Sequence, residues 1–275
     1  MRRWDLAMER AHLDGAGFPV LDVRDSSHRP MVLKLGGVGS DTAHQARIFT
    51  AADGHGYVRL LDDMADVEAL LLERLGAPLH TTTPDPHRQV VVIAGLLEKV
   101  WQLPLSLGLP TTPEEKARGL LEILGDASGR GVSSEPMERA IATALDLATQ
   151  LAADPGHRQV VVHGDPHPGN VLAGGPDHAF IDPDGFRCEP EYDGGVCLRD
   201  HQQHLEELLR VEGRAAAHRF LADLAERLAH LLDLDAERIL AWAFVERVTT
   251  GVHLQRLGYV ESGASWLTTA GRLVS

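Results

Sequence analysis

Short apolar runs separated by polar turns dominate the first quarter of the chain, and they predict a β-rich region. Runs at residues 18–23 and 30–35 flank a polar turn, which is typical of a β-hairpin. A single helix is expected at 41–52, where the spacing of apolar residues changes. Two more apolar runs, at 57–61 and 69–76, predict further strands. The pattern therefore predicts a small β-rich lobe that contains one helix.

From about residue 85 onward the apolar residues adopt helical spacing. Val90, Ile93, Leu97 and Trp101 show it first, and Thr112-Pro113-Glu114-Glu115 is a capping box with proline at the first helical position. The helices expected from these patterns cover about residues 90–101, 113–124, 137–151, 214–232, 236–258 and 263–273. The second part of the chain is therefore expected to be a larger, mainly helical lobe, and the fold class to be α+β.

Two short apolar strands interrupt the helical region and carry polar groups at their ends. Val160 to Val162 leads into His163-Gly164-Asp165, and Asn170 follows five residues after the aspartate. The second strand ends in Ile181-Asp182. Phosphoryl transfer from ATP needs a carboxylate to position the attacking hydroxyl, and an Asn and an Asp to hold Mg²⁺. The spacing His-x-Asp-x-x-x-x-Asn matches the kinase catalytic loop, so the sequence predicts a kinase.

Two other interpretations fit this segment. Gly, Asp, Pro and Asn are turn-forming residues, so the segment could be only a turn. His163, Asp165 and His167 could instead be the metal ligands of a metallohydrolase, since His and Asp bind transition metals. The remaining histidines lie scattered along the sequence without ligand spacing, which favours the kinase.

Lysine is rare in this chain, which has only Lys34, Lys99 and Lys116 among its 26 basic residues. Lys34 alternates with apolar residues in a predicted strand, and kinases place a phosphate-contacting lysine on their third strand. The alternative is an edge-strand lysine that prevents aggregation. After the last strand of the small lobe, Glu73-Arg74-Leu75 is expected to cross to the large lobe, where its backbone could hydrogen-bond an adenine.

Composition limits the function further. With 275 residues, 44% of them hydrophobic and 24% charged, the chain suits a soluble globular protein of one or two domains. The longest apolar run, from Val90 to Leu97, is too short to span a bilayer. No secretory signal is visible, and Cys188 and Cys197 form neither a disulfide framework nor a zinc pattern. These features favour the cytoplasm.

The net charge of −14 argues against a nucleic-acid partner and is compatible with a cationic small molecule. Part of this charge lies near the predicted site, because residues 182–207 hold eight carboxylates against two arginines. Such a stretch would suit a polyamine or a guanidinium sugar, although a solvated acidic face is an equal alternative. Protein partners cannot be inferred from the composition.

Several stretches of the sequence resemble a known family. The segment Val162 to Leu172 resembles the signature of the aminoglycoside phosphotransferases and their small-molecule kinase relatives. Residues 181–185, 191–193 and 198–200, together with 32–34, 58–61 and 71–74, narrow the resemblance to the streptomycin 6-phosphotransferase and hydroxyurea kinase branch. The similarity extends over about residues 18–200.

The resemblance implies a protein-kinase-like bilobal fold that uses ATP and Mg²⁺. It implies an N-terminal nucleotide-binding lobe at 1–75 and a C-terminal catalytic and substrate-binding lobe at 76–275. By position, Asp165 would be the catalytic base and Lys34 the phosphate contact. Asp193 would brace the catalytic loop. The other site residues expected are Asn170 and Asp182 for the metal, Glu73 and Leu75 for ATP, and Asp200 and Glu246 for the substrate, with Asp184 a further metal contributor.

The activity implied is phosphorylation of a hydroxyl on a streptomycin-like or other cationic antibiotic, which would confer resistance. Two departures from the family are visible. Gln45 stands where the family usually has a glutamate that pairs with the strand lysine, and Asp41 is a possible substitute. The phosphate-covering loop is poorly defined, with only Gly15 and Gly17 before the first predicted strand. These departures leave a non-catalytic binding protein for a cationic molecule as the second hypothesis.

Overall fold

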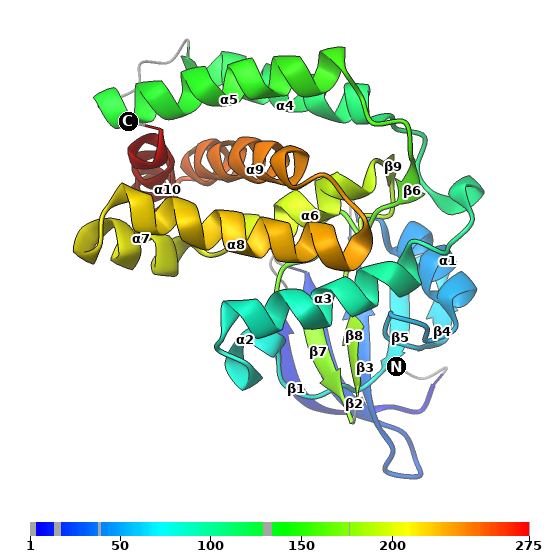
Figure 1. Ribbon diagram of the computed structural model, residues 1–275. Helices are drawn as coiled ribbons and strands as arrows, with labels where there is room; N and C mark the ends of the chain where they lie inside the picture. The colour runs from blue at the N-terminus through cyan, green and yellow to red at the C-terminus, as the bar shows by residue number, and fades with distance from the viewer. Residues whose placement is uncertain (1–3, 14–17, 38–39, 129–133, 176, 275) are drawn as a thin grey trace.

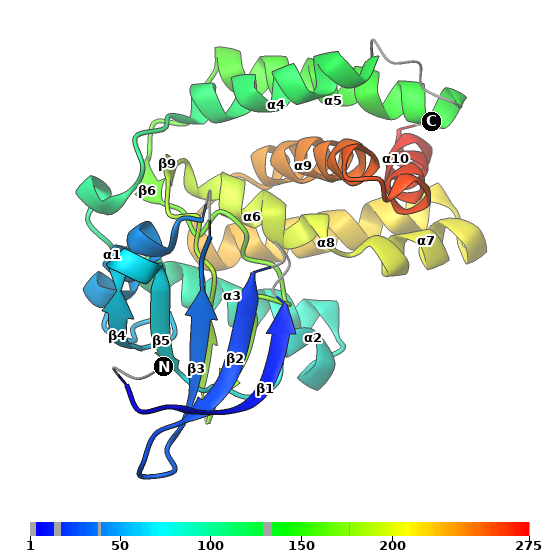
Figure 2. The same ribbon diagram turned by 180° about the vertical axis from the view of Figure 1, so that it is seen from behind.

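A five-stranded antiparallel sheet forms the N-terminal lobe of the computed structural model, which describes residues 4–13, 18–37, 40–128, 134–175 and 177–274. The strand order is β1-β2-β3-β5-β4 (Figures 1 and 2). The strands are β1 (Ala7–Leu13), β2 (Pro19–Arg24), β3 (Pro30–Leu35), β4 (Leu60–Met64) and β5 (Ala69–Glu73), with a 3₁₀ turn η1 (Ala65–Val67) between the last two. Helix α1 (Thr42–Ala52) lies beside β4 and β5. The prediction of a β-rich lobe with one helix is confirmed.

Strand β3 lies inside the sheet, not at its edge. It pairs with β2 on one side and with β5 on the other, so that Lys34 stands opposite both Val20 and Leu70. The hairpin predicted from the polar turn is thus confirmed, and the interpretation of Lys34 as an edge-strand lysine is wrong. The neighbouring strand β1 was not predicted, because its sequence AMERAHL is too polar to look like a strand.

The strand predicted at 57–61 was placed too early, because β4 begins at Leu60. Tyr57 and Val58 are buried against the other lobe, and the Val58 amide donates to the Phe180 carbonyl at 2.8 Å. The Phe180 amide donates in turn to the Gly56 carbonyl at 2.8 Å. These residues therefore join the small lobe to the end of the second predicted strand, at Phe180, which their apolar character alone did not reveal.

Helices make up most of the second lobe (Figure 1). They are α2 (Leu79–Thr82), α3 (Pro86–Val100), α4 (Pro113–Ser128), α5 (Glu135–Ala153), α6 (Pro190–Arg199), α7 (Gln202–Val211), α8 (Arg214–Leu232), α9 (Ala236–Arg256) and α10 (Val260–Leu273), with a 3₁₀ turn η2 (Leu105–Leu107). The capping box forms as predicted: the Thr112 amide donates to Glu115 at 2.8 Å, and the Glu115 amide donates to Thr112 Oγ1 at 3.1 Å. Helices α2, α6 and α7 were not predicted.

Two short β-ladders carry the predicted catalytic segment. Strand β6 (Val160–Val161) pairs with β9 (Arg187–Cys188), and β7 (Val171–Gly174) pairs with β8 (Asp177–Phe180). The segment that crosses between the lobes is hydrogen-bonded to the β7–β8 hairpin, because the Gly76 amide donates to the Ala173 carbonyl at 2.7 Å. The five-stranded sheet and the β7–β8 hairpin are therefore held in one framework.

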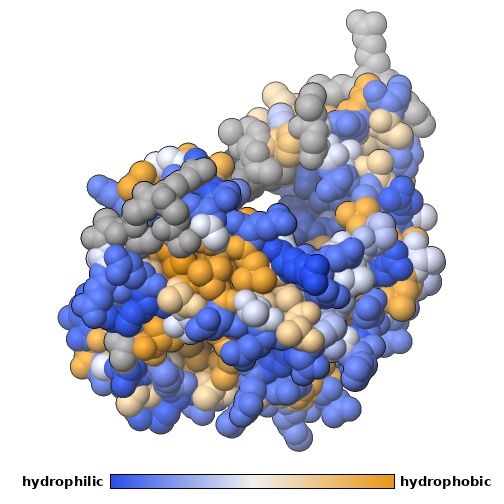
Figure 3. Space-filling view, turned by 90° about the horizontal axis from the view of Figure 1, so that it is seen from above, coloured by the Kyte–Doolittle hydropathy of each residue, from blue (hydrophilic) through white to orange (hydrophobic). Residues whose placement is uncertain are grey.

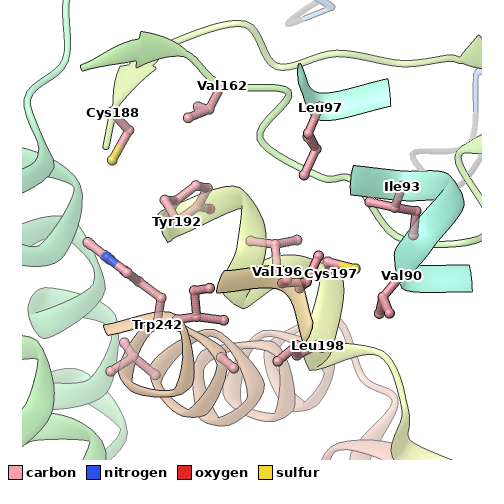
Figure 4. Packing of buried hydrophobic residues seen from close by; sticks show 14 of the residues in the cluster. Val90, Ile93, Leu97, Val162, Cys188, Tyr192, Val196, Cys197, Leu198 and Trp242 are labelled. Carbon is pink, nitrogen blue, oxygen red and sulfur yellow. The ribbon is translucent and has the colours of Figure 1, made fainter. Parts of the chain in front are cut away.

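The main hydrophobic core extends from α3 through α6 to α9 (Figure 4). Close packing of α6 against α9 depends on Gly195, since a Cβ there would lie 2.4 Å from the Cβ of Trp242. Cys188 and Cys197 are both buried and free within this core, and burial raises the pKa of each thiol. Among the described residues, none of the helices has the length and apolar character needed to cross a membrane.

Candidate active site

The loop after β6 is held in place by one buried carboxylate, that of Asp193 on α6. Its Oδ2 accepts from the His163 amide at 2.8 Å and its Oδ1 accepts from the Gly164 amide at 2.9 Å. The indole nitrogen of Trp101 on α3 donates to Oδ2 at 2.9 Å. Burial raises the pKa of Asp193 to about 6, although all three donors oppose that rise. Asp193 therefore braces the loop after β6, as expected.

His163 is a structural residue of the loop. Its Nε2 lies 2.9 Å from the Ile181 carbonyl oxygen and its Nδ1 accepts from the Asp165 amide at 3.1 Å, so both ring nitrogens are engaged. The ring stacks on Tyr57, and burial lowers its pKa to about 4. His163 therefore has no nitrogen to offer a metal, and within the described ranges no group of three or more His, Cys, Asp or Glu could hold one. The metallohydrolase interpretation is not supported.

Asp165 lies at the start of the loop within a set of donors. Arg199 Nη2 donates to Oδ1 at 2.7 Å, and the Asn170 side-chain amide donates to Oδ2 at 3.3 Å. His167 Nε2 lies 3.4 Å from Oδ2. Burial alone would raise the pKa of Asp165, but the His167 hydrogen bond and the charge of Arg199 outweigh it and hold that pKa well below its usual range. Asp165 is therefore ionised at neutral pH.

Arg199 connects Asp165 to Asp200, which was expected to bind substrate. Arg199 Nε donates to Asp200 Oδ1 at 2.6 Å, and the other Asp200 oxygen lies 3.5 Å from His167 Nδ1. Burial alone would lower the pKa of His167, but the neighbouring Asp165 and Asp200 raise it. Asp200 thus lies in the ionic network behind the catalytic loop.

The strand lysine meets the second predicted carboxylate directly. Lys34 Nζ donates to Asp182 Oδ1 at 2.6 Å and to Gln45 Oε1 at 3.3 Å. The Gln45 amide nitrogen also donates to the Pro183 carbonyl at 3.4 Å. The assignment of Gln45 to the position that faces the lysine is therefore confirmed. Residues 148 positions apart in the sequence meet here.

A pocket of about 640 Å³ lies between the sheet and the catalytic hairpin, and five of the predicted site residues line it. These are Lys34, Glu73, Leu75, Asn170 and Asp182. Val32, Leu72, Leu172 and Ile181 give it apolar walls suited to a flat ring. Figure 3 shows that one face of the molecule is hollowed between its two masses. Gly15 and Gly17 lie outside the described residues.

Glu246 lies outside this pocket, on α9. It is buried, accepts from the Tyr192 hydroxyl at 2.7 Å, and lies 3.4 Å from Lys116 Nζ. The charges of Glu246 and Lys116 both act on Asp184. The side chain of Asp184 is open to solvent, but protein surrounds it on several sides. That surrounding protein and the charge of Asp165 raise the pKa of Asp184 to about 6.

The acidic stretch at 182–207 is not one continuous face. Glu189 is buried and binds Arg238 at 2.6 Å, and Asp193 braces the loop. Glu207 is exposed and pairs with Arg210 on the same helix. Three other members have contacts around the same loop: Asp182 accepts from Lys34, the Asp184 amide donates to the His163 carbonyl, and Asp200 accepts from Arg199. The sequence alone could not separate structural carboxylates from those at the site.

Sequence reasoning did not assign roles to Arg199 and Lys116. Arg199 lay within one of the stretches that carried the family resemblance, but nothing local shows that it reaches Asp165. Lys116 is one of only three lysines in this chain, as Lys34 is, and the rarity of lysine was the signal that could have identified it.

Comparison with known proteins identifies the family. The family described as aminoglycoside/hydroxyurea antibiotic resistance kinase matches residues 3–258. A streptomycin 6-kinase of Streptomyces glaucescens is 30% identical over 259 residues, covering 88% of this chain and 76% of that protein. A streptomycin 6-kinase of Streptomyces griseus is 28% identical over 248 residues, covering 87% and 76%.

Solved structures share the fold at low sequence identity. A thermostable mutant of aminoglycoside phosphotransferase APH(4)-Ia, in a ternary complex with ADP and hygromycin B, aligns with a TM-score of 0.67 at 12% identity over 99% of this chain and 96% of that one. A Plasmodium vivax ethanolamine kinase aligns with a TM-score of 0.63 at 14% identity, over 97% and 82%. These likenesses confirm the protein-kinase-like bilobal fold. With the match over residues 3–258, the chain belongs to the aminoglycoside/hydroxyurea antibiotic resistance kinase family and is a phosphotransferase.

Proposed function

We propose that this protein transfers the γ-phosphoryl group of ATP to a hydroxyl of a streptomycin-like or other cationic antibiotic, and that this modification confers resistance. The observation that carries the proposal is the convergence of Lys34, Asn170 and Asp182 on one pocket, with Asp165 bonded to Asn170 beside it. We place the boundary between the nucleotide lobe, 1–75, and the catalytic and substrate lobe, 76–275, at the crossing. Because the reaction consumes ATP, we place it in the cytoplasm.

The nucleotide would lie with its adenine against the crossing. The Glu73 amide already donates to the Arg59 carbonyl at 3.0 Å, so Glu73 would offer its own carbonyl to the base. Leu75 would offer its backbone amide, and its side chain lines the same pocket. Lys34 would turn its ammonium from Asp182 toward the phosphates, where a compact charge on a flexible stem suits the task.

The oxygen atoms that Asp182 and Asn170 offer to this pocket fit Mg²⁺, a hard cation that prefers oxygen ligands. Asp182 offers a carboxylate, and the Asn170 amide nitrogen is committed to Asp165 at 3.0 and 3.3 Å, so the amide oxygen is the ligand atom that Asn170 offers. Asp184 is a further candidate ligand. Bound there, the metal would neutralise charge on the phosphates.

Asp165 would orient the acceptor hydroxyl by accepting its hydrogen bond. With its pKa held low, it is a weak acceptor of a full proton, and positioning is its larger contribution. Arg199 would fix the carboxylate in the required direction. The substrate's positive charge would be met by Asp200 and Glu246.

An ATP-consumption screen tests the proposal. Streptomycin, other aminoglycosides, hydroxyurea and other cationic natural products would each be offered with ATP·Mg²⁺, and phosphorylated products would be identified by mass spectrometry. We expect transfer to at least one hydroxylated cationic compound, and expect it to disappear in Lys34→Met. A protein that binds ATP·Mg²⁺ but modifies no member of the panel would contradict the proposed substrate class. A folded protein that binds no nucleotide at millimolar ATP would contradict the kinase proposal itself and favour the non-catalytic binding protein.

A further inference from the structure

The ammonium of Lys116, in the first turn of α4, lies in a cage made by two aromatic rings and a carboxylate. Its Nζ lies 4.9 Å from the ring centre of Tyr192 and 5.3 Å from that of Phe186. Glu246 Oε1 lies 3.4 Å from Nζ and also accepts from the Tyr192 hydroxyl at 2.7 Å. Aromatic faces and a buried carboxylate are the usual means of binding a cationic nitrogen. The protein therefore holds one of its own cations in a cation-binding site.

We propose that this cage, formed by Phe186, Tyr192 and Glu246, binds a positively charged nitrogen of the acceptor substrate, and that Lys116 is a tethered competitor that the substrate displaces. Lys116 would then be a specificity-determining residue, because only a ligand whose cation binds better than the tethered ammonium gains the site. The inference rests on the proposed function for the identity of the ligand, whose chemical class is an ammonium or guanidinium compound.

The cage is built from the same segments that hold the catalytic loop. Phe186 follows Asp184 by two residues, and its carbonyl accepts from the Val162 amide at 2.9 Å, just before the loop begins. Tyr192 immediately precedes Asp193, which holds the loop from the other side. A cation in the cage is therefore placed beside the catalytic groups.

The properties of the two charged side chains favour displacement. The side chain of Lys116 is 26% exposed, whereas that of Glu246 is 8% exposed and fixed by Tyr192. The lysine stem is flexible and its ammonium hydrates strongly, so Lys116 can swing into water while the rest of the cage stays in place. Glu246, left without the lysine, would gain a new cationic partner from the substrate. The rings need no movement, because Phe186 and Tyr192 already pack edge to face at 5.3 Å.

A purely structural role for Lys116, as an ion pair between α4 and α9, predicts something different. Its removal would then lower stability without creating a binding site for small cations. The two roles are separated by a ligand that carries only the recognised group, such as n-butylammonium, because its binding needs neither ATP nor turnover.

The test measures n-butylammonium binding by NMR titration to the wild type, Lys116→Met and Lys116→Ala, with Lys99→Met as the matched exposed-lysine control. We expect both Lys116 variants to bind at least tenfold more tightly than the wild type and the control. Adding Glu246→Gln to Lys116→Met should remove the gain. Lys116→Met should also lower the KM for the antibiotic that accepts the phosphate, while leaving the KM for ATP unchanged.

Equal affinity of the wild type and both variants for n-butylammonium, in folded samples and whatever their melting temperatures, would overturn the cage proposal. A gain that survives Glu246→Gln would also overturn it, because the ligand would then be bound elsewhere. If the Lys116 variants gain no n-butylammonium affinity but the protein still phosphorylates an antibiotic, the cage proposal fails and the proposed function stands. Failure of phosphorylation with n-butylammonium binding intact contradicts the proposed function alone.

Discussion

Arg199 and Asp165 form an ion pair at the centre of the site, with Arg199 Nη2 donating to Asp165 Oδ1 at 2.7 Å. Through its Nε the same guanidinium donates to Asp200 at 2.6 Å, so it is held from both ends. The pair keeps Asp165 ionised and fixes the direction of its carboxylate. Arg199 is therefore a positioning residue, acting on the acceptor hydroxyl through Asp165.

Replacing Arg199 should therefore impair the chemical step more than nucleotide binding. We expect Arg199→Met to lower kcat about 10- to 100-fold, because a misplaced catalytic group costs that order of rate. The KM for ATP should change little, and the pH below which activity fails should rise as Asp165 loses its stabilising charge. Arg210→Met, which breaks an exposed ion pair with Glu207, is the control. A pH profile identical to that of the wild type would show that Arg199 does not act through Asp165.

Gln45 should bind the Lys34 ammonium less strongly than a glutamate at the same position would. Its Oε1 lies 3.3 Å from the ammonium and carries no full charge, whereas active protein kinases pair this lysine with a glutamate. We expect Gln45→Glu to tighten ATP·Mg²⁺ binding several-fold by calorimetry. Gln150→Glu, at an exposed position of α5, should leave it unchanged. Weaker ATP binding in Gln45→Glu would mean that the neutral side chain is required here.

Asp193 should contribute to both stability and turnover. Its removal leaves the amides of His163 and Gly164 and the indole of Trp101 without their acceptor. Unpaired buried donors cost about 1–3 kcal/mol each, so we expect Asp193→Ala to lose at least about 2 kcal/mol of unfolding free energy in urea. kcat should fall as well, because the catalytic loop loses its anchor. An exposed control, Asp223→Ala, should be neutral, and equal stability of both variants would refute the bracing role.

Asp184 should give the enzyme a pH dependence near neutrality. With a folded-state pKa of about 6 it is ionised above that pH and protonated below it, so kcat/KM should fall as the pH drops through about 6. The contribution of Asp184 to the free energy of unfolding has the opposite pH dependence. This contribution is fully present below pH 3.8, the ordinary pKa of the group, and is lost as the pH rises through about 6. Asp184→Asn should remove the limb near pH 6, whereas Asp177→Asn should retain it. A limb unchanged in Asp184→Asn would assign it to another group.

Local signals predicted the local structure well. The capping box at Thr112 and the hairpin around residues 24–29 were correct because the residues that define each lie next to one another in the sequence. Helix α6 was missed because it contains Gly194 and Gly195 in its interior, which weaken helix propensity. Its stability comes instead from packing against α9, where those glycines allow the close approach.

The candidate site likewise contains local features, which the sequence predicts, and contacts between distant elements, which it does not. Asp165 and Asn170 could be predicted because the loop that joins them is short and its spacing is specific. The contacts of Lys34 with Asp182 and of Arg199 with Asp165 join separate elements, and their geometry follows only from the fold. The cage around Lys116 draws on α4, α6, α9 and the segment before β9, so no single stretch of sequence indicates it.

The most direct test of the account compares Asp165→Asn with the wild type in single-turnover phosphate transfer, using a substrate found in the screen. We predict that ATP·Mg²⁺ affinity by calorimetry stays within a few-fold, while the transfer rate falls about 10²- to 10⁴-fold, because the acceptor hydroxyl loses the carboxylate that orients it. Asp177→Asn, an exposed aspartate on β8, should transfer at the wild-type rate. Equal transfer rates in the wild type and Asp165→Asn, both well above background, would contradict the assignment of this loop as the catalytic centre.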